Sequence, residues 1–330
     1  MSSEPETPDR RIDPASLPDE HRAAAMARAI TGRQIKELKR FPTGLAHAVF
    51  DITTSDQHTF VLRVTRPSQA ASFRGAIYWH TLLRPRGVPL PDLIYADPSG
   101  TAFGYPVMLM ERLPGTDLGA IYPTLTRQEK YRLASRLVAI QERVRSLPLG
   151  SGFGYAHSYD DPSLHHSWLD VLLADQQRSR QRLRQSGVVS EEIVDRVSDA
   201  LFSYRGYFDS IEPRCFLDDT TTKNVIVSHG SLSGLVDVDT VCFGDVVQVV
   251  GLTQMALLSS GYDTDYIDAW TEALHVTAEQ RKALTLYTAM YCVDFISEMG
   301  QSFNKETPEP VDDQSRDHLL RILDRLLLRT

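Results

Sequence analysis

Three polar side chains in one short segment of the chain have the types and the spacing to hold a hard cation. Two apolar runs, 225–227 and 235–238, are rich in valine and flank a turn, which is typical of a β-hairpin. Asp219 and Asn224 precede the first run, and Asp237 lies at the end of the second. If the runs pair, all three side chains lie near one end of the hairpin. Carboxylate and amide oxygens are ligands that Mg²⁺ accepts, so the segment is a candidate cation site.

The segment lies between elements that change in character along the chain. After a polar start, one helical pattern and several short runs rich in Val, Ile, Phe and Thr predict helix 18–32, strands 34–40, 48–53 and 59–65, helix 69–83, and strands 91–96 and 106–113. From residue 126 onward, apolar residues recur mainly at helical spacing. That spacing predicts helices 127–145, 168–185, 191–211, 246–259, 265–275, 278–303 and 313–328, interrupted by strands 215–217, 225–227 and 234–238. We therefore expect an α+β protein with a flexible tail (1–17), a small β-rich lobe (18–113) and a larger, mainly helical lobe (114–330).

The composition excludes several classes of protein. The chain has 330 residues, 42% of them hydrophobic and 24% charged, which is typical of a globular protein and not of a disordered one. The net charge of −8 makes the protein a poor candidate for coating nucleic acid or an anionic membrane, because like charges repel. Cys215, Cys242 and Cys292 lack the spacing of a zinc site or a disulfide framework. With no apolar signal segment or membrane span in the sequence, we expect a cytoplasmic protein.

The order of the polar residues resembles that of the aminoglycoside phosphotransferase and choline-kinase-like family of small-molecule kinases. Asp219 and Asn224 have the D-x-x-x-x-N spacing of a kinase catalytic loop, and Asp237 takes the place of the metal-binding aspartate that follows it. Other segments match in the same order: the nucleotide loop 42–50, the V-L-R strand 61–64, the G-V-P-L-P segment 87–91, the hinge 110–115 and the run 237–245 that ends in Gly-Asp. The resemblance, which covers residues 34–275, implies a protein-kinase-like two-lobe fold and a divergent member of the family.

The resemblance also implies a role for each matching residue. Asp219 would be the catalytic residue that orients the acceptor hydroxyl and accepts its proton, and Asn224 and Asp237 would hold Mg²⁺ against the phosphates of ATP or GTP. The N-terminal lobe would bind the nucleotide, and the C-terminal lobe would carry catalysis and the acceptor. The implied nucleotide contacts come from the loop, the V-L-R strand, the hinge and the position before the metal-binding asparagine: Gly44, Arg63, Met110, Arg112 and Lys223.

The sequence departs from the family pattern at several positions. Leu217 stands where the family usually has His, and Asp218 stands where it usually has Gly. The carboxyl of Asp218 either raises the pKa of one member of the pair with Asp219 or faces away. Lys223 replaces a small residue, and its ammonium either contacts a phosphate or is solvated. The segment 74–77 has no acid to pair with Arg63, although the family usually offers a Glu there.

Two hypotheses from different classes follow from these residues. The first is an ATP-dependent phosphotransferase that acts on a hydroxyl of a small molecule, such as an aminoglycoside, a nucleoside antibiotic or an amino alcohol. The alternative is a non-catalytic kinase-fold module that binds a ligand or a partner, which Leu217 and the missing acid favour. A protein kinase is a weaker third idea. The sequence leaves open the acceptor, the choice between ATP and GTP, the oligomeric state, and a role in resistance or in biosynthesis.

Other polar residues have simpler interpretations. Asp245 is expected to cap the helix that starts near residue 246, because Asp is a favoured N-cap residue. His157, His165 and His166 lack the spacing of metal ligands. Four arginines alternate with other residues in one helical segment: Arg178, Arg180, Arg182 and Arg184. Residues two apart do not share a helix face, so we expect a solvated helix and not a nucleic-acid site.

Overall fold

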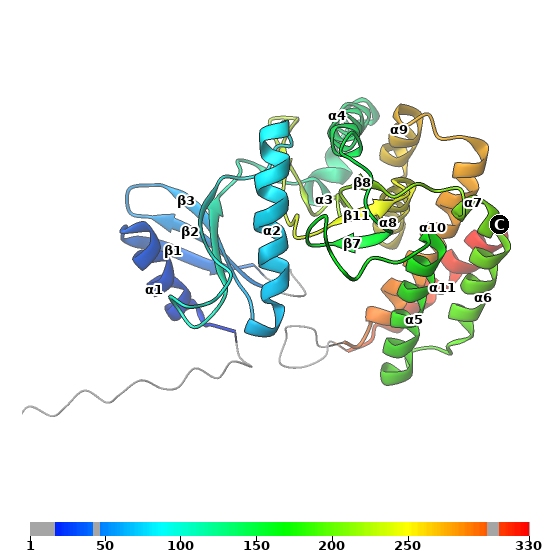
Figure 1. Cartoon of the computed structure of the whole chain (residues 1–330), viewed down its shortest axis with the longest axis horizontal. Coiled ribbons are helices and arrows are strands. Elements are labelled where there is room, and N and C mark those ends of the chain that lie inside the picture. The colour runs from blue at the N-terminus through cyan, green and yellow to red at the C-terminus, as the bar shows by residue number, and fades with distance from the viewer. Residues whose placement is uncertain (1–16, 42–46, 302–309, 330) are drawn as a thin grey trace, which may run out of the picture. The chain divides into compact units, whose positions relative to one another are not determined.

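The computed structural model describes residues 17–41, 47–301 and 310–329, and Figure 1 shows the whole chain. The architecture is α+β, as predicted. The chain forms two compact units, one from Met1–Phe73 with Asp92–Arg112 and the other from Arg74–Pro91 with Leu113–Thr330. The segment 74–91, which we expected in the N-terminal lobe, thus groups with the second unit. Of the predicted tail, only Leu17 lies within the described residues, and it packs against the core of the first unit.

The first unit is built on a five-stranded antiparallel sheet. The strands lie in the order β1 (Ile35–Arg40), β2 (Ala48–Thr54), β3 (Thr59–Val64), β5 (Val107–Glu111) and β4 (Leu93–Asp97). Side chains alternate between the two faces of a strand, and β2 accordingly alternates between buried and half-buried residues. Helix α1 (Glu20–Thr31) packs its apolar face on the buried side of the sheet and is capped at its start by Asp19.

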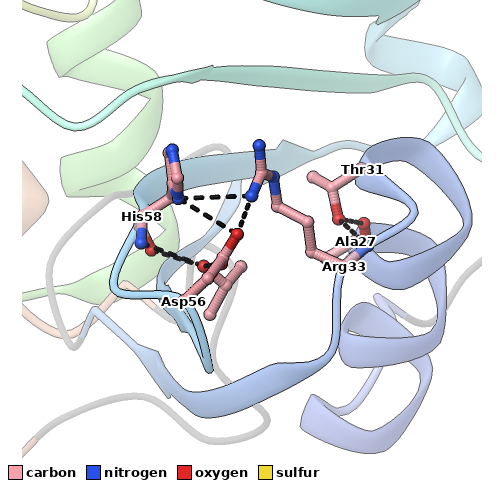
Figure 2. A network of polar contacts seen from close by, with 6 residues as sticks. Ala27, Thr31, Arg33, Asp56 and His58 are labelled. Atoms are coloured by element: carbon pink, nitrogen blue, oxygen red, sulfur yellow. Dashed lines mark hydrogen bonds and ion pairs between the residues drawn. The ribbon is translucent and has the colours of Figure 1, made fainter.

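Polar contacts hold the turn between β2 and β3, as Figure 2 shows. Arg33, which follows α1, forms an ion pair with Asp56 in this turn. The Nδ1 atom of His58 lies 3.3 Å from Nη1 of Arg33 and 3.3 Å from Oδ2 of Asp56. The hydroxyl of Thr54 donates to Oδ1 of Asp56 at 2.6 Å. These contacts connect the tip of the predicted hairpin to the segment that follows α1.

The second unit is mainly helical. Its long helices are α4 (Arg127–Arg145), α5 (Trp168–Ser186), α6 (Glu192–Ser203), α8 (Val247–Ser259), α9 (Asp265–Ala273), α10 (Ala278–Glu298) and α11 (Asp313–Leu327), and it also receives most of α2 (Ala70–Leu83). Helix α10 is the centre of this group, because it packs against α5, α6, α8 and α11 (Figure 1). Two single-turn helices, α3 (Leu118–Ile121) and α7 (Arg205–Phe208), complete the set. None of the helices in the described ranges has the length and apolar character needed to cross a membrane.

Two small antiparallel sheets lie among these helices. One has the order β10 (Ser231–Leu235), β9 (Val225–Ser228) and β6 (Thr116–Asp117), and the other has the order β7 (Gly154–Ala156), β11 (Val241–Gly244) and β8 (Arg214–Phe216). The segment 217–224 joins the end of β8 at Phe216 to the start of β9 at Val225. The loop that carries Asp219 therefore joins two separate sheets.

The structure corrects several predicted boundaries. The strand expected at 234–238 is β10, which ends at Leu235, because the chain turns away before Asp237. The helix expected at 191–211 is broken at Tyr204 into α6 and α7. Helix α10 ends at Glu298, short of the predicted residue 303. Strands β7 and β11 were missed because each has only three or four residues and pairs with partners distant in sequence.

Asp245 does more than bind the start of a helix. Its Oδ1 accepts a hydrogen bond of 3.0 Å from the backbone N–H of Val247, the first residue of α8, but the N-cap position is Val246 and not Asp245 as predicted. Its Oδ2 accepts hydrogen bonds from the hydroxyls of Tyr207 at 2.6 Å and Tyr287 at 2.9 Å. The indole N–H of Trp168 in turn donates to the hydroxyl of Tyr287 at 2.7 Å. Burial raises the pKa of the Asp245 carboxyl, and these hydrogen bonds oppose that rise. One buried carboxylate thus connects α5, α7, α8 and α10.

Replacing Asp245 by Ala is expected to lower the free energy of unfolding by about 3 kcal/mol, because two buried tyrosine hydroxyls and one backbone N–H lose their acceptor. Thermal or urea denaturation measures the change. Asp199→Ala is the matched control, since Asp199 is exposed on α6 and should shift stability by less than about 0.5 kcal/mol. Equal losses in the two variants would contradict the connecting role of Asp245.

Candidate active site

A buried amide holds the loop between β8 and β9. Gln141 of α4 has an exposed fraction of 0%, and its Nε2 donates to the backbone oxygen of Leu217 at 2.9 Å and to Oγ1 of Thr220 at 3.2 Å. Its Oε1 accepts from the backbone N–H of Leu217 at 2.9 Å. The Gln141 side chain thus satisfies both backbone groups of Leu217, as a neighbouring strand would. This contact fixes the chain one residue before Asp218.

The hairpin of β9 and β10 brings the three predicted residues to its open end. Val225 pairs with Leu235, and the backbone N–H of Val236 donates to the oxygen of Asn224 at 3.0 Å. Asn224 therefore lies beside the segment that leads into Asp237. The amide of Asn224 also donates to the backbone oxygen of Asp219 at 3.1 Å. The geometry that we expected from the paired runs is present, although the second strand is displaced toward the N-terminus.

Both candidate carboxylates are exposed. One oxygen of Asp219 accepts a hydrogen bond of 2.8 Å from the hydroxyl of Thr221, which holds the carboxylate in place. Asp237 has a φ of 62°, in the left-handed region that few residues other than glycine adopt. Asp tolerates this region better than β-branched residues do, and the turn ends β10 at this point. The strained backbone thereby fixes where the Asp237 carboxylate leaves the hairpin.

The donor set at this end of the hairpin fits Mg²⁺. Its side-chain donors are oxygens, from Asp237 and from the carbonyl of Asn224, and Mg²⁺ prefers oxygen ligands. No group of three His, Cys, Asp or Glu residues with the arrangement of a metal site occurs in the part of the chain that the structure describes. A site made of Asn224 and Asp237 suits Mg²⁺, because this ion usually takes its other ligands from phosphate and water.

Asp218 differs from its neighbour Asp219 in its surroundings. Burial, together with the nearby carboxylates of Asp219 and Asp237, raises the pKa of the Asp218 carboxyl to about 8. The hydroxyl of Thr240 donates to its Oδ2 at 3.4 Å, a weak contact that lowers the pKa only in part. Asp218 is therefore largely neutral at pH 7. Of the two alternatives left open for this pair, the structure supports a raised pKa, at Asp218.

Gly75 occupies the segment of α2 where the family usually has an acid. A Cβ atom at this position would lie 2.3 Å from the backbone oxygen of Asp239 and 2.6 Å from Nδ1 of His157. Glycine is therefore required by the close approach of α2 to the chain that follows Asp237. Packing within the second unit therefore excludes an acidic side chain at Gly75 itself.

The predicted nucleotide contacts lie mostly in the first unit. Arg63 on β3 is buried, and its guanidinium lies 5.4 Å from the centre of the Phe73 ring. Met110 is buried at the C-terminal part of β5. Arg112 binds Oδ1 of Asp51 through Nε at 3.1 Å.

The other two predicted nucleotide contacts differ in where they lie. Gly44 lies outside the described residues. Lys223 is exposed and directly precedes Asn224 in the second unit. It is therefore the predicted nucleotide contact that the structure places next to Asp219, Asn224 and Asp237.

Sequence reasoning missed Gln141, which contacts the loop across a separation of 76 residues. No local motif marks it. The signal is a polar residue in the apolar stripe of a predicted helix, between the buried residues Leu137 and Val144. A glutamine in such a place must find hydrogen-bond partners within the core.

The chain matches known proteins over most of its length. The family model described as the phosphotransferase enzyme family matches residues 37–284. No curated protein sequence gives a significant match.

Solved structures show the same fold. A thermostable mutant of the aminoglycoside phosphotransferase APH(4)-Ia in its apo form is 15% identical, with a TM-score of 0.68, over 93% of this chain and 98% of that chain. The streptomycin–ATP–APH(2″)-IIa ternary complex is 16% identical, with a TM-score of 0.62, over 95% and 97%. A putative fructosamine-3-kinase from Thermobifida fusca is 16% identical, with a TM-score of 0.61, over 93% and 98%.

Gln141→Met is expected to lower the free energy of unfolding by about 2–4 kcal/mol, because the buried N–H and C=O of Leu217 lose their partner. It should also speed hydrogen exchange at residues 217–224 more than elsewhere. Gln128→Met, on the exposed start of α4, is the control and should change neither quantity. Unchanged exchange of the loop in Gln141→Met would show that other contacts hold it.

Asp218→Asn is expected to change how stability depends on pH. The folded-state pKa of about 8 lies above the ordinary value of 3.8, so the wild-type protein loses stability as pH rises between these values. The variant lacks this group, and its melting temperature relative to wild type should rise from pH 5 to pH 9. Asp199→Asn is the control. A pH-independent difference would contradict the raised pKa of Asp218.

Proposed function

The chain belongs to the phosphotransferase enzyme family, and from this membership we propose that it transfers the γ-phosphoryl group of ATP or GTP to a hydroxyl of a small molecule. The observation that carries the proposal is the open end of the β9–β10 hairpin. Asp219, Asn224 and Asp237 lie together there, in the order and spacing of a kinase loop. One similar structure is a complex of a phosphotransferase with ATP and streptomycin, which supports the use of a nucleotide.

In this mechanism Asp219 orients the acceptor hydroxyl and accepts its proton as the phosphoryl group is transferred. Thr221 holds one oxygen of the Asp219 carboxylate, which restricts its orientation. The neutral Asp218 leaves Asp219 as the charged member of the pair. Phosphoryl transfer depends mainly on positioning and on neutralising charge, so the protein has to hold Asp219 and the metal ligands in place and need not form a covalent intermediate.

Asn224 and Asp237 would hold Mg²⁺. The ion, when bound, neutralises negative charge on the nucleotide phosphates. Of the residues described in the first unit, Arg63 would contact the α- and β-phosphates, and the backbone around Met110 and Arg112 would contact the base. Gly44 and Lys223 complete the proposed nucleotide contacts. A cytoplasmic location, an aminoglycoside, nucleoside antibiotic or amino alcohol as acceptor, and a role in antibiotic modification belong to the same proposal.

The second candidate function is a non-catalytic kinase-fold module that binds a ligand or partner. It is favoured by Leu217 and by the lack of an acid in the segment 74–77, where Gly75 has no room for a side chain. The two functions differ in whether nucleotide binding needs Mg²⁺ and Asp237. We favour the phosphotransferase over the binding module because Asp219, Asn224 and Asp237 are all present and lie together.

Nucleotide binding is expected to raise the melting temperature by several degrees. A ligand at 100 times its Kd adds about 2.7 kcal/mol to the stability of the folded state. The shift is measured with ATP and GTP, each with and without Mg²⁺, on wild type and Asp237→Ala. The proposal requires a shift that depends on both Mg²⁺ and Asp237. A Mg²⁺-independent shift that survives in Asp237→Ala would favour the binding module, and no shift would exclude the kinase mechanism.

Replacing Asp219 by Asn should leave Mg²⁺–nucleotide binding intact and lower phosphoryl transfer by about 10²–10⁴-fold, the usual contribution of a general base. Transfer is measured as nucleoside diphosphate release with a panel of hydroxylated acceptors. Asp160→Asn, at an exposed turn, is the control. Full activity in Asp219→Asn would assign the proton-accepting role to another group.

A further inference from the structure

The loop between β8 and β9 contains three consecutive threonines, and each of them is buried. The exposed fractions of Thr220, Thr221 and Thr222 are 1%, 9% and 7%. The hydroxyl of Thr220 accepts a hydrogen bond of 3.2 Å from the amide of Gln141 in α4. The backbone oxygen of Thr222 accepts a hydrogen bond of 3.0 Å from the backbone N–H of Gly119 in α3. The two neighbours of Thr221 are thus fixed by two different helices.

Thr221 contacts both the proposed proton acceptor and a proposed metal ligand. Its hydroxyl donates to Oδ1 of Asp219 at 2.8 Å. Its backbone oxygen accepts a hydrogen bond of 2.9 Å from the backbone N–H of Asn224. The side-chain amide of Asn224 in turn donates to the backbone oxygen of Asp219 at 3.1 Å. These three hydrogen bonds form a closed ring, and the ring holds Asp219 and Asn224 in fixed positions relative to each other.

The Thr221 hydroxyl distinguishes the two oxygens of the Asp219 carboxylate. A hydroxyl has one proton to donate, and Thr221 donates it to Oδ1. Within the part of the chain that the structure describes, no group donates a hydrogen bond to Oδ2, and the Asp219 side chain is exposed. A proton that arrives on Oδ2 leaves the bond from Thr221 intact, whereas a proton on Oδ1 would displace the donated hydrogen.

From this geometry we propose that Thr221 is a positioning residue, which holds Oδ1 of Asp219 so that Oδ2 is the atom that takes the proton of the acceptor. In the transfer step the O–H bond of the acceptor breaks, its oxygen bonds to the γ-phosphorus, and the proton moves to Oδ2. The nucleoside diphosphate leaves with the electron pair of the broken P–O bond. The inference rests on the proposed phosphotransferase function and adds the atom that accepts the proton and the residue that orients it.

Replacing Thr221 by Val removes the hydroxyl and keeps the branched shape of the side chain. We expect kcat to fall by about 10–100-fold, because a small misplacement of a catalytic group costs about this much. The KM for ATP and the thermal shift caused by Mg²⁺ with AMP-PNP should stay at their wild-type values, because nucleotide binding does not use the hydroxyl. ADP release is measured with Mg²⁺ and ATP, with water, kanamycin or ethanolamine as the acceptor.

Two further variants separate positioning from a general effect on the loop. Thr221→Ser restores the hydroxyl and should recover most of the activity, although serine rotates more freely than the β-branched threonine. Thr222→Val is the matched control, since Thr222 is buried to a similar degree and its hydroxyl bonds to none of the described residues. This control should keep the wild-type kcat. If Thr221→Val lowers the melting temperature, Thr221→Ala provides the same comparison without a bulky apolar group.

A second measurement does not depend on turnover. In protein labelled with ¹³C at the aspartate carboxyl carbon, the NMR signal of Asp219 is identified by its absence from Asp219→Asn. This signal should shift in Thr221→Val and stay in place in Thr222→Val, because only the first variant loses the hydrogen bond to Oδ1.

Wild-type kcat in Thr221→Val, an equal loss in Thr222→Val, no recovery in Thr221→Ser or an unmoved Asp219 signal would each overturn the inference. Absence of ADP release by the wild-type protein with all three acceptors would instead reject the proposed function. The two failures are therefore distinguishable.

Discussion

The amide of Gln141 is the contact on which the geometry of the candidate site depends. The loop 217–224 leaves one small sheet and enters another, so neither sheet can satisfy its backbone by regular pairing. Gln141 supplies a donor and an acceptor to Leu217 and a donor to Thr220, from a helix that is itself packed in the core. With the start of the loop held in this way, the hairpin pairing of β9 and β10 fixes its end. Asp219 lies between these two constraints.

The same part of the molecule separates acids that would otherwise repel one another. Asp218, Asp219 and Asp237 lie within electrostatic reach, and three full negative charges there would oppose both folding and the approach of phosphates. Burial keeps Asp218 largely neutral, while Asp219 and Asp237 are exposed. Asp245, the acid of the Gly-Asp run, is instead used inside the core by two tyrosines and a helix start. Residues that look alike in the sequence therefore have different roles because their solvation differs.

Helix α5 shows a similar division of chemically identical residues. The sequence alone predicts that its four arginines do not form one basic patch, because of their spacing. Which pair lies beside α6 and which lies beside α10 depends on how the helices pack. In the pair beside α10, Arg182 forms ion pairs with Asp294 and Glu298, and Arg178 forms one with Asp175 of its own helix. The packing of the helices therefore decides which acids each arginine meets.

Much of the candidate site could be predicted from the sequence, because it depends on local patterns. The alternation of apolar residues predicts the first sheet, helical spacing predicts most of the helices, and the D-x-x-x-x-N spacing with a following Asp predicts the candidate catalytic loop. The family assignment follows from the same motifs and agrees with the match over residues 37–284. The boundaries were less predictable: β10 ends before Asp237, and the short strands β7 and β11 form only because of partners far away in the chain.

The sequence by itself determined the type and the order of the groups that could do chemistry, because these depend on spacing along the backbone. Only the tertiary structure decided their environments. The role of Gln141, the neutral state of Asp218, the need for Gly75 and the ion pairs between α5 and α10 all depend on contacts between segments that are distant in sequence. Desolvation, close approach and ion pairing are properties of position in space, and a linear pattern does not contain them.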